Sequence, residues 1–446
     1  MKDVVVIGAG PTGLAISYFL LKKYDDINIH ILEKENYLGG LGRTETNGRI
    51  SYDMGPHYFY TTSRQVYDFM NEIMGGKFLE RCKVALIYNS GKYYDYPVRL
   101  NIRNMRNLSH ELLSVGLSYM MKWTYCNKRN LEDYFIRVYG KKLYHIFFED
   151  YTQKVWGLHP SDLPYDFLGG RIERDGIIDI LRQTFFRQKN KSKDNLEDYF
   201  LYNFLYPQNG CGEFWNKVVY RIEKVGGKIE KDAEIEEIRS AEKIIRYNSK
   251  EAHYDLLICT NPVVDTIEYL GLDKKLKHEF EEATAFRSLI FVNIEIENMK
   301  IGSEKIDDVH YIYLHNKDIV SGRVTIFSNW SSNMTKTGAS SCCLEYYCDI
   351  NDDLLLRKDA EWIEVAIQDL MNANFIEKKE QILSCSVIKA PRCYPITLNH
   401  AIKDEVISEI EKNGIKTLGR MGRHEYISMA KCIEEAMDYV ANLGEM

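Results

Sequence analysis

The feature that most restricts how this chain can fold is a glycine-rich turn that directly follows a short apolar run near its start. Residues 4–7 are apolar and β-branched, which is typical of a buried parallel strand. Gly8 allows a sharp turn, Gly10 lets the backbone approach a phosphate, and Gly13 lets the next helix pack closely. The pattern predicts a strand, a turn and a helix over about 12–24 whose N-terminus faces a pyrophosphate.

A second strand and a second glycine pair follow at the spacing of a dinucleotide-binding unit. Residues 28–32 form another short strand, and Glu33 at its end is placed to accept hydrogen bonds from a ribose 2′-hydroxyl. Gly39 and Gly40 would bring a further backbone segment close to the pyrophosphate, which favours FAD over NAD. The alternative is a Rossmann-like turn that binds nothing. We predict that the N-terminal unit holds FAD.

Charge and composition exclude several other classes of protein. The net charge is −7, which argues against a general nucleic-acid binder but leaves an anionic small substrate open. The ten cysteines show no metal-type spacing, so we expect no metal site and a reduced compartment. No apolar stretch approaches the roughly 20 residues that span a bilayer, and we expect no signal peptide and no membrane insertion. These features predict a cytoplasmic enzyme.

A chain of 446 residues is too long for one simple core, so we expect several subdomains. Residues 101–200 have a mostly helical pattern, whereas four segments between 288 and 349 alternate like the strands of a separate sheet. Two helices and a strand are expected between that sheet and residue 391. A strand at 254–260, and a strand, glycine turn and helix after residue 416, return the chain to the dinucleotide-binding unit.

We therefore predict an α/β fold, in which a FAD-binding Rossmann-like domain carries an inserted, mainly helical subdomain and an inserted antiparallel β-sheet subdomain. The predicted segments are 1–83, 203–285 and 397–446 for the FAD-binding domain, 101–202 for the helical subdomain, and 84–100 and 286–396 for the β-sheet substrate subdomain.

Short motifs along most of the chain resemble those of the UDP-galactopyranose mutase-like family, within the amine-oxidase- and protoporphyrinogen-oxidase-like FAD-dependent proteins. Each motif alone is modest, but their order and spacing together are specific. The motifs are Gly39-Gly40-Leu41, Asp53-Met-Gly-Pro-His57, Tyr151-Thr-Gln-Lys-Val-Trp156, Leu168-Gly-Gly-Arg171, Arg323-Val-Thr-Ile-Phe-Ser-Asn-Trp330, Tyr394-Pro-Ile, and Gly419-Arg420 followed by Tyr426.

The resemblance implies roles for particular side chains. Arg323 and Arg420 would clamp the two phosphates of a sugar nucleotide, and Arg171 would close or shape the sugar site. A guanidinium suits this role because it presents a rigid fork of donors to phosphate oxygens. The predicted substrate-binding residues are Tyr151, Trp156, Arg171, Tyr313, Arg323, Tyr394, Arg420 and Tyr426.

His57 has two interpretations. It could contact the flavin, or it could satisfy a hydrogen bond in the core; the resemblance implies a place beside the flavin. The predicted catalytic residues are His57, Arg171, Arg323 and Arg420. The predicted cofactor-binding residues are Gly8, Gly10, Gly13, Glu33, Gly40, Arg43, His57, Gly419 and Met429.

The reaction that the resemblance implies is an isomerisation by reduced FAD. N5 of the flavin would attack the anomeric carbon of a nucleotide sugar such as UDP-galactopyranose, and the pyranose would reclose as a furanose. We expect a nucleotide-diphosphate sugar as substrate, a role in cell-surface polysaccharide biosynthesis and, as an open possibility, a homo-oligomer. Two alternatives stay open: an amine-oxidase- or desaturase-type oxidoreductase, which Arg43 after the double glycine favours, and a flavin-holding scaffold without turnover.

Overall fold

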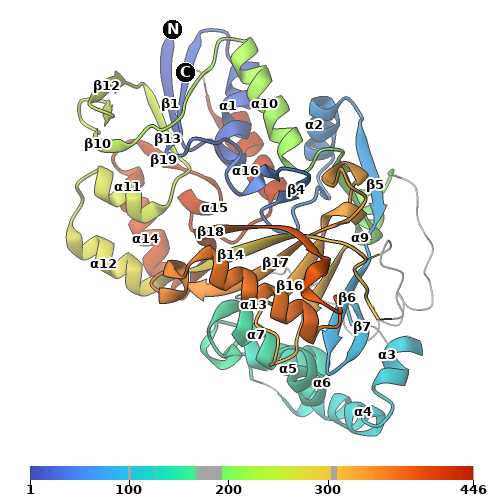
Figure 1. Ribbon diagram of the computed structural model, residues 1–446. Coiled ribbons are helices and arrows are strands. Elements are labelled where there is room, and N and C mark those ends of the chain that lie inside the picture. Colours follow the sequence, from blue (N-terminus) through green and yellow to red (C-terminus); the bar gives the residue numbers. More distant parts are fainter. Residues whose placement is uncertain (99–101, 126, 166, 168–192, 303–308, 445–446) are drawn as a thin grey trace.

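The computed structural model describes residues 1–446 with the exception of 99–101, 126, 166, 168–192, 303–308 and 445–446. Two sheets organise the described residues: a five-stranded parallel sheet and a seven-stranded mixed sheet. Helices cover both, and a group of helices lies at one end of the molecule, beyond the edge of the larger sheet (Figure 1).

The parallel sheet brings together strands from widely separated parts of the chain. Its order is β19-β13-β1-β2-β9, and every neighbouring pair is parallel. The strands are β1 (Lys2–Ile7), β2 (Ile27–Leu32), β9 (Lys228–Glu230), β13 (Leu256–Cys259) and β19 (Ile415–Thr417). β1 is central and apolar on both faces, as expected for a strand that is covered by helices on both sides.

Alternate residues of β1 enter two different cores. Val4 and Val6 pack with the helices on one face, whereas Val5 and Ile7 pack with those on the other. The first face carries α1 (Pro11–Lys23), α2 (Arg64–Met74), α10 (Gly212–Lys224) and α16 (Met429–Asn442). The second carries α11 (Val263–Tyr269), α12 (Lys274–Ala283), α14 (His400–Glu411) and the antiparallel strands β10 (Ile235–Arg239), β11 (Ile244–Tyr247) and β12 (Lys250–His253).

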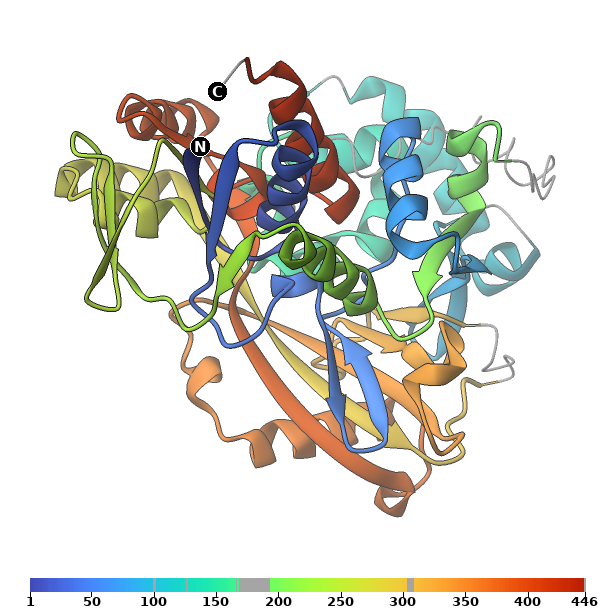
Figure 2. The same cartoon turned by 90° about the horizontal axis from the view of Figure 1, so that it is seen from above.

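The larger sheet lies beside the parallel sheet and is mostly antiparallel (Figures 1 and 2). Its order is β18-β14-β17-β16-β15-β6-β7, with only β15 and β6 parallel. The strands are β6 (Ala85–Asn89), β7 (Lys92–Tyr96), β14 (Thr284–Ile296), β15 (Tyr311–Leu314), β16 (Arg323–Ile326), β17 (Ser340–Asp349) and β18 (Ile382–Thr397). Helix α13 (Asp359–Asn372) covers one face, and the other packs against a core that includes Tyr52 and Tyr206.

The remaining elements connect these sheets or form the helical end of the molecule. The connecting strands are β3 (Thr44–Asn47), β4 (Ile50–Asp53), β5 (Phe78–Cys82) and β8 (Asn203–Pro207). The further helices are α3 (Ile102–Asn107), α4 (Leu112–Met121), α5 (Leu131–Tyr139), α6 (Lys141–Phe147), α7 (Glu149–Trp156), α9 (Leu196–Tyr202) and α15 (Gly419–Gly422). Within the described residues, no helix combines the length and the apolar character that crossing a bilayer requires.

The predicted α/β fold class is confirmed, including the Rossmann-like unit and the sheet rich in antiparallel pairs. One local prediction is wrong. Between Asp349 and Ile382, all of which the structure describes, there is a single α-helix, α13, and the other short segments are 3-10 turns. Those turns are three or four residues long, too short for an amphipathic helix. The subdomain boundaries stay predictions.

Candidate functional site

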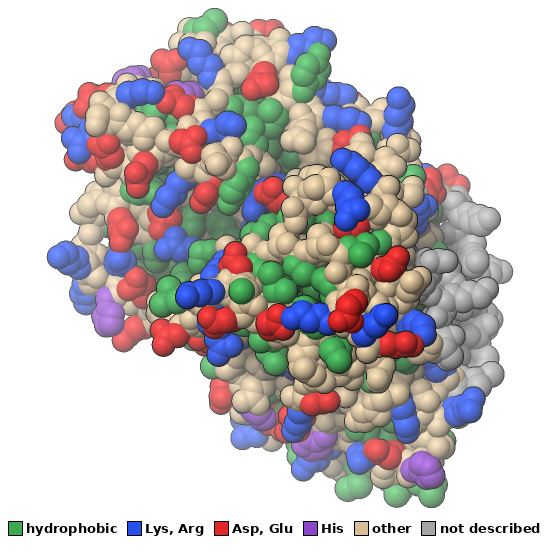
Figure 3. Space-filling model, viewed as in Figure 1, with side chains coloured by type: hydrophobic (Ala, Val, Ile, Leu, Met, Phe, Trp, Pro, Cys, Tyr) green, Lys and Arg blue, Asp and Glu red, His purple; other side chains and the backbone are tan. Residues whose placement is uncertain are grey.

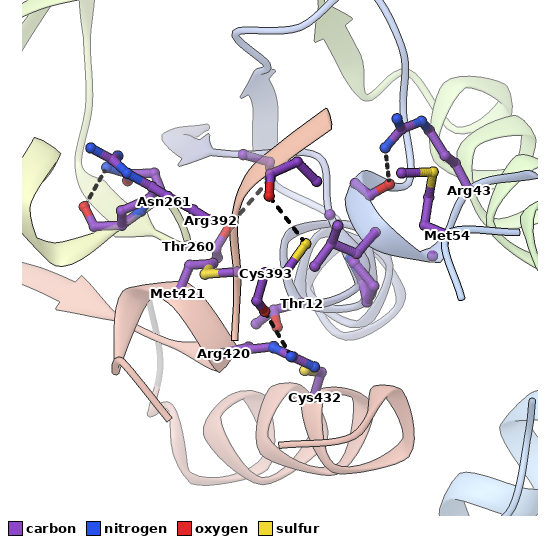
Figure 4. Close-up of a pocket in the computed structure, with 18 of the residues that line it drawn as sticks. Thr12, Arg43, Met54, Thr260, Asn261, Arg392, Cys393, Arg420, Met421 and Cys432 are labelled. Atoms are coloured by element: carbon purple, nitrogen blue, oxygen red, sulfur yellow. Dashed lines mark hydrogen bonds between the residues drawn. The ribbon is translucent and has the colours of Figure 1, made fainter. Parts of the chain in front are cut away.

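A cavity of about 1350 Å³ lies where the glycine turns of the parallel sheet face the larger sheet (Figure 4). Most of the predicted site residues contribute to its wall, although they come from distant parts of the sequence. Those that do are Gly8, Gly10, Glu33, Gly40, Arg43, His57, Tyr313, Arg323, Tyr394, Arg420, Tyr426 and Met429. Its volume exceeds the roughly 300–1,000 Å³ of ordinary ligand pockets, so it has room for a dinucleotide and a second ligand.

The first glycine turn opens the cavity to the start of α1. Gly8 has a φ of +98°, which a side chain would strain. A Cβ on Gly13 would lie 1.9 Å from the carbonyl oxygen of Gly8, so only glycine lets the helix approach this turn. A Cβ on Gly10 would meet nothing within 4 Å. Gly10 precedes the helix without a capping side chain, which leaves the first N–H groups of α1 free for an anion.

The second glycine turn packs directly on the first. The N–H of Gly39 donates to the carbonyl of Ala9 at 2.9 Å. A Cβ on Gly40 would lie 3.2 Å from the Cα of Gly10. Glu33 is part of the same arrangement, because its carboxylate accepts the N–H of Ala9 at 2.6 Å. A carboxylate offers about four acceptor positions, so Glu33 retains capacity for a ribose hydroxyl.

Arg43 is nearly buried, with 9% of its surface exposed, and it forms part of the cavity wall. Its Nη1 donates to the carbonyl of Gly40 at 2.9 Å, and its Nε donates to Glu45 at 2.6 Å. The guanidinium also lies 3.8 Å from the ring centroid of Tyr37. Arg43 therefore holds the second glycine turn in place.

His57 is half-buried beside the two predicted phosphate-binding arginines, and its Nδ1 atom is buried. Burial lowers the pKa of His57 to about 3, and the positive charges of Arg420 and Arg323 contribute to the shift. Its ring is therefore neutral at physiological pH. Within the described part of the chain, its Nδ1 has no hydrogen-bond partner. His57 can offer a neutral donor or acceptor to a bound molecule, but not a cation.

Arg323 is held by a buried carboxylate on the neighbouring strand. Arg323 of β16 pairs directly with Glu345 of β17 in the antiparallel ladder. Nε of Arg323 lies 2.8 Å from one oxygen of Glu345, and Nη2 lies 2.5 Å from the other. Nη2 also lies 3.4 Å from the hydroxyl of Tyr394. The bidentate pair fixes the guanidinium and balances its charge, and it leaves Nη1 available to a ligand.

Arg420 is positioned differently, by backbone carbonyls and two aromatic rings. Its Nη2 donates to Cys393 O at 2.7 Å, and its Nη1 donates to Ile427 O at 3.3 Å. The guanidinium lies 4.5 Å from the ring centroid of Tyr426 and 5.3 Å from that of Tyr394. Its buried Nε has no hydrogen-bond partner among the described residues, and no acidic residue among them forms an ion pair with it. Arg420 keeps its positive charge for a ligand.

Comparisons with known proteins agree with this geometry. Residues 6–73 match the model of the NAD(P)-binding Rossmann-like domain. A protein assigned as a UDP-galactopyranose mutase from Klebsiella pneumoniae is 26% identical over 37% of this chain and 44% of its own length. The dTDP-fucopyranose mutase of Escherichia coli is 27% identical over 38% of this chain and 45% of its own. The matched segments thus span less than half of each relative.

Solved structures match over nearly the whole chain. A crystal structure of reduced UDP-galactopyranose mutase gives a TM-score of 0.83 and covers 99% of this chain and 93% of that one, at 18% identity. The resemblance to the UDP-galactopyranose mutase-like family is confirmed. A candidate protoporphyrinogen oxidase from Exiguobacterium sp. 255-15 also matches, with a TM-score of 0.75 over 99% of this chain and 98% of that one, at 16% identity. The fold is thus shared by mutase-like and oxidase-like proteins.

Some predicted site residues do not contribute to the cavity wall. Gly13 and Gly419 allow close packing, since a Cβ on Gly419 would lie 2.1 Å from the hydroxyl of Thr12. Trp156 supports the wall from behind, with its ring centroid 5.3 Å from that of Tyr426. Tyr151 also lies behind the wall, 5.7 Å from Tyr313 between ring centroids. Arg171 lies outside the described residues.

Two acidic residues close to the candidate site have no role assigned from the sequence. Glu345 carries no predicted role, although an acid within an apolar strand, Cys-Cys-Leu-Glu-Tyr-Tyr-Cys, is a signal that a buried cation faces it. Asp53 is fully buried and accepts hydrogen bonds from Thr44 Oγ1 at 2.5 Å, Tyr206 Oη at 2.6 Å and Cys211 N at 3.1 Å. It ties the strand before His57 to the turn before α10.

Proposed function

We propose that this protein is a flavin-dependent nucleotide-sugar mutase that interconverts pyranose and furanose forms. The observation that carries the proposal is the convergence of Arg323, Arg420 and neutral His57 in one cavity with two facing glycine turns. The glycine turns suit a dinucleotide, and the two guanidiniums suit the diphosphate of a second ligand. A scaffold protein without turnover would have no use for this second set.

The residues present fit FAD as the dinucleotide. The first N–H groups of α1 and the open space at Gly10 would accommodate the pyrophosphate, and Glu33 would bind the ribose. The Nδ1 of His57 and the Nε of Arg420 are buried and unpaired within the described chain, as expected of groups that face a bound molecule. When bound in its reduced form, FAD supplies a nucleophilic nitrogen for the anomeric carbon of the sugar.

The chain itself would bind and orient the substrate. Arg420 would attract the diphosphate most strongly, because its charge is not balanced by a described carboxylate. Arg323 would add directional donors from a guanidinium that Glu345 already holds. Tyr394 lies between them, and burial raises the pKa of its phenol well above the usual value. This phenol stays protonated and can donate a hydrogen bond to a phosphate or a sugar oxygen.

The protonation states around the cavity favour chemistry by the cofactor over chemistry by a side-chain acid or base. Burial lowers the pKa of His57 to about 3, far below the pH at which it would exchange a proton during turnover. Burial raises the pKa of Tyr313 as well. A mutase that uses the flavin as its nucleophile requires no ionised nucleophile from the protein.

The relatives support a substrate class for this proposal. One is assigned as acting on UDP-galactopyranose and another on dTDP-fucopyranose, so the shared chemistry is a nucleoside diphosphate linked to a hexopyranose. Furanose sugars of this kind would serve polysaccharide biosynthesis. UDP-galactose is the first substrate to test.

Product analysis under reducing conditions tests the proposal. The purified protein is reduced with dithionite without air and incubated separately with UDP-galactopyranose, UDP-galactofuranose and dTDP-fucopyranose, and the products are separated by chromatography. We expect ring interconversion of at least one sugar nucleotide, and none while the flavin is oxidised. If no sugar nucleotide reacts in either redox state, the proposal is wrong.

Substitution of Arg420 separates the second ligand from the cofactor. Arg420→Ala should weaken UDP binding about 10- to 100-fold, the usual contribution of hydrogen bonds to a charged group, and should leave the flavin absorbance in place. Arg64→Ala is a matched control, because Arg64 is exposed, forms an ion pair with Asp68 one helical turn away and does not contribute to the cavity wall. Equal UDP affinity in both variants would contradict the proposed role of Arg420.

A second candidate is an oxidoreductase of the amine-oxidase type. Arg43 favours it, because it follows a double glycine as in such oxidases and lies at the cavity wall. This candidate predicts oxygen consumption when the oxidised protein receives an amine such as putrescine. Oxygen uptake with a substrate amine, together with the absence of ring interconversion, would establish it over the mutase.

A further inference from the structure

Helix α4 carries its apolar residues on the outside. Four side chains at spacings of four, three and one residues form a single stripe on this helix: Leu113, Leu117, Met120 and Met121. Between 57% and 85% of the surface of each is exposed. In an ordinary amphipathic helix of a globular protein such a stripe faces the core, as it does in α2. In α4 the apolar stripe faces solvent instead.

The opposite side of α4 attaches the helix to the molecule. Val115 is buried, with 7% of its surface exposed. The hydroxyl of Ser118 accepts the N–H of Lys142 at 2.9 Å at the start of α6. Because α4 is anchored through this side, the stripe of Leu113, Leu117, Met120 and Met121 is held outward. We call these four residues the α4 stripe.

The segment around the α4 stripe has the opposite charge from the rest of the protein. Residues 101–142 contain eight Lys and Arg residues and three Asp and Glu residues, a net charge of +5, in a chain whose net charge is −7. Arg106 and Lys141 are exposed, and neither forms an ion pair with a described acid. Lys142, next to Lys141, pairs with Glu111 just before α4 at 3.0 Å. Two exposed cations without an ion-pair partner among the described residues therefore lie in the neighbouring helices, one in α3 before α4 and one at the start of α6.

The α4 stripe also lies at an extremity of the molecule. Figure 1 places α4 at the tip of the helical end, away from the parallel sheet. Hydrophobic side chains reach the surface at this lower end in Figure 3. A protruding helix of ten residues is far too short to cross a bilayer, but it can lie in its interface.

We propose that α4 binds the surface of a bilayer that contains anionic lipids. The α4 stripe would enter the boundary between headgroups and acyl chains, and Arg106 and Lys141 would contact anionic headgroups. Charge complementarity favours this occupant over a second copy of the chain, because a symmetric dimer through α4 would bring two positive segments together. The proposal does not depend on the mutase activity.

Vesicle sedimentation tests the proposal with the full-length, flavin-loaded protein. Vesicles of equal parts phosphatidylcholine and phosphatidylglycerol are compared with pure phosphatidylcholine vesicles at about 0.1 M and 1 M salt. We expect binding to the anionic vesicles that is at least about tenfold stronger than to the neutral ones, and that weakens at high salt. Equal partitioning to both vesicle types, or none, would overturn the proposal.

Two variants assign the binding to α4. Replacing the four residues of the α4 stripe with serine should reduce binding to the anionic vesicles at least about a hundredfold, and Arg106→Glu with Lys141→Glu should reduce it about tenfold or more. A control that replaces Tyr220, Val225, Val320 and Leu356 with serine removes four exposed apolar side chains from other surfaces and should bind as the parent does.

Sedimentation velocity tests whether a second copy of the chain, rather than a bilayer, covers α4. If α4 is instead an interface between copies, the serine variant of the α4 stripe will have a smaller mass than the parent, and neither protein will bind vesicles. That result would overturn the proposal. Retained flavin absorbance and an unchanged thermal midpoint verify that each variant is folded.

Discussion

The two sides of the cavity differ in what forms the wall: main chain on one side and side chains on the other. On the parallel-sheet side, backbone forms the wall, and Gly8, Gly10 and Gly40 matter because they have no side chain. On the side of the larger sheet, long polar and aromatic side chains form the wall, and Arg323 is held by a buried partner. The first side excludes side chains so that a ligand can approach the main chain, and the second uses them to contact a ligand.

The two sides of the cavity therefore tolerate different substitutions. The backbone side depends on local spacing, so its sensitive positions are those where a single methyl group meets a neighbouring carbonyl. The side-chain side depends on pairs formed across strands, so its sensitive positions are those whose loss leaves a buried charge. A single substitution can therefore disturb one side of the cavity and leave the other intact.

The largest effect is expected from Gly13→Ala. The new Cβ would lie 1.9 Å from the carbonyl oxygen of Gly8, and neither backbone segment can move without disturbing β1 or α1. We expect a loss of at least about 3 kcal/mol in the free energy of unfolding, measured by urea denaturation. Gly116→Ala in α4 is the matched control, since its Cβ meets nothing within 4 Å and alanine favours a helix. Similar stabilities for the two variants would contradict the packing argument.

The next largest effect is expected on the side of the larger sheet, where Glu345 holds Arg323. Glu345→Gln would leave Arg323, only 13% of whose side chain is exposed, without a compensating carboxylate. Removing one partner of a buried pair costs about 3–5 kcal/mol, so the thermal midpoint should fall by several degrees. The exposed pair of Lys300 and Glu377 provides the control, because Glu377→Gln should not move the midpoint measurably. An unchanged midpoint in Glu345→Gln would mean that the ion pair is not structurally required.

A smaller effect should appear in the pH dependence of stability. Burial raises the pKa of Asp53 to about 7, well above its value of about 3.8 in an unfolded chain. The folded state therefore binds this proton more tightly. Its contribution is complete below about pH 4 and is lost as the pH rises through about 7. Asp53→Asn cannot ionise, so its unfolding free energy should decrease less than that of the parent between pH 4 and 7.

Denaturation curves at pH 4, 5.5 and 7 measure this difference. Asn can accept only some of the hydrogen bonds that Asp53 receives from Thr44, Tyr206 and Cys211, so the variant should also be less stable by about 1–3 kcal/mol at low pH. Parallel pH profiles for the parent and Asp53→Asn would show that Asp53 does not titrate in this range.

The same contrast explains what could be predicted from sequence. The two glycine turns and Glu33 lie within forty residues, and the strand and helix that they require are local, so their arrangement follows from spacing alone. The fold class could also be predicted from the sequence, because the strands of the parallel sheet are short apolar runs whereas those of the larger sheet alternate between apolar and polar residues. The family motifs located Arg323 and Arg420, and the structure brings both to one cavity.

The partners of those arginines could not be predicted in the same way. Glu345 faces Arg323 because of the register between β16 and β17, which depends on the whole sheet. The neutral state of His57 depends on burial and on two arginines that follow it by hundreds of residues. The outward stripe of α4 has the same periodicity as the inward stripe of α2, and only the packing of α6 on its other side distinguishes them.

The smallest effect on stability is expected from Gly10→Ala, which separates cofactor binding from folding on the backbone side. Its Cβ would meet nothing within 4 Å in the protein and would project into the space where a pyrophosphate would approach the start of α1. We therefore expect an unchanged unfolding midpoint for the cofactor-free protein, and an FAD affinity that is at least about tenfold lower by fluorescence titration. Tight FAD binding by this variant would mean that the pyrophosphate does not approach Gly10. Gly8 and Gly40 would then be the positions at which the ligand approaches the main chain.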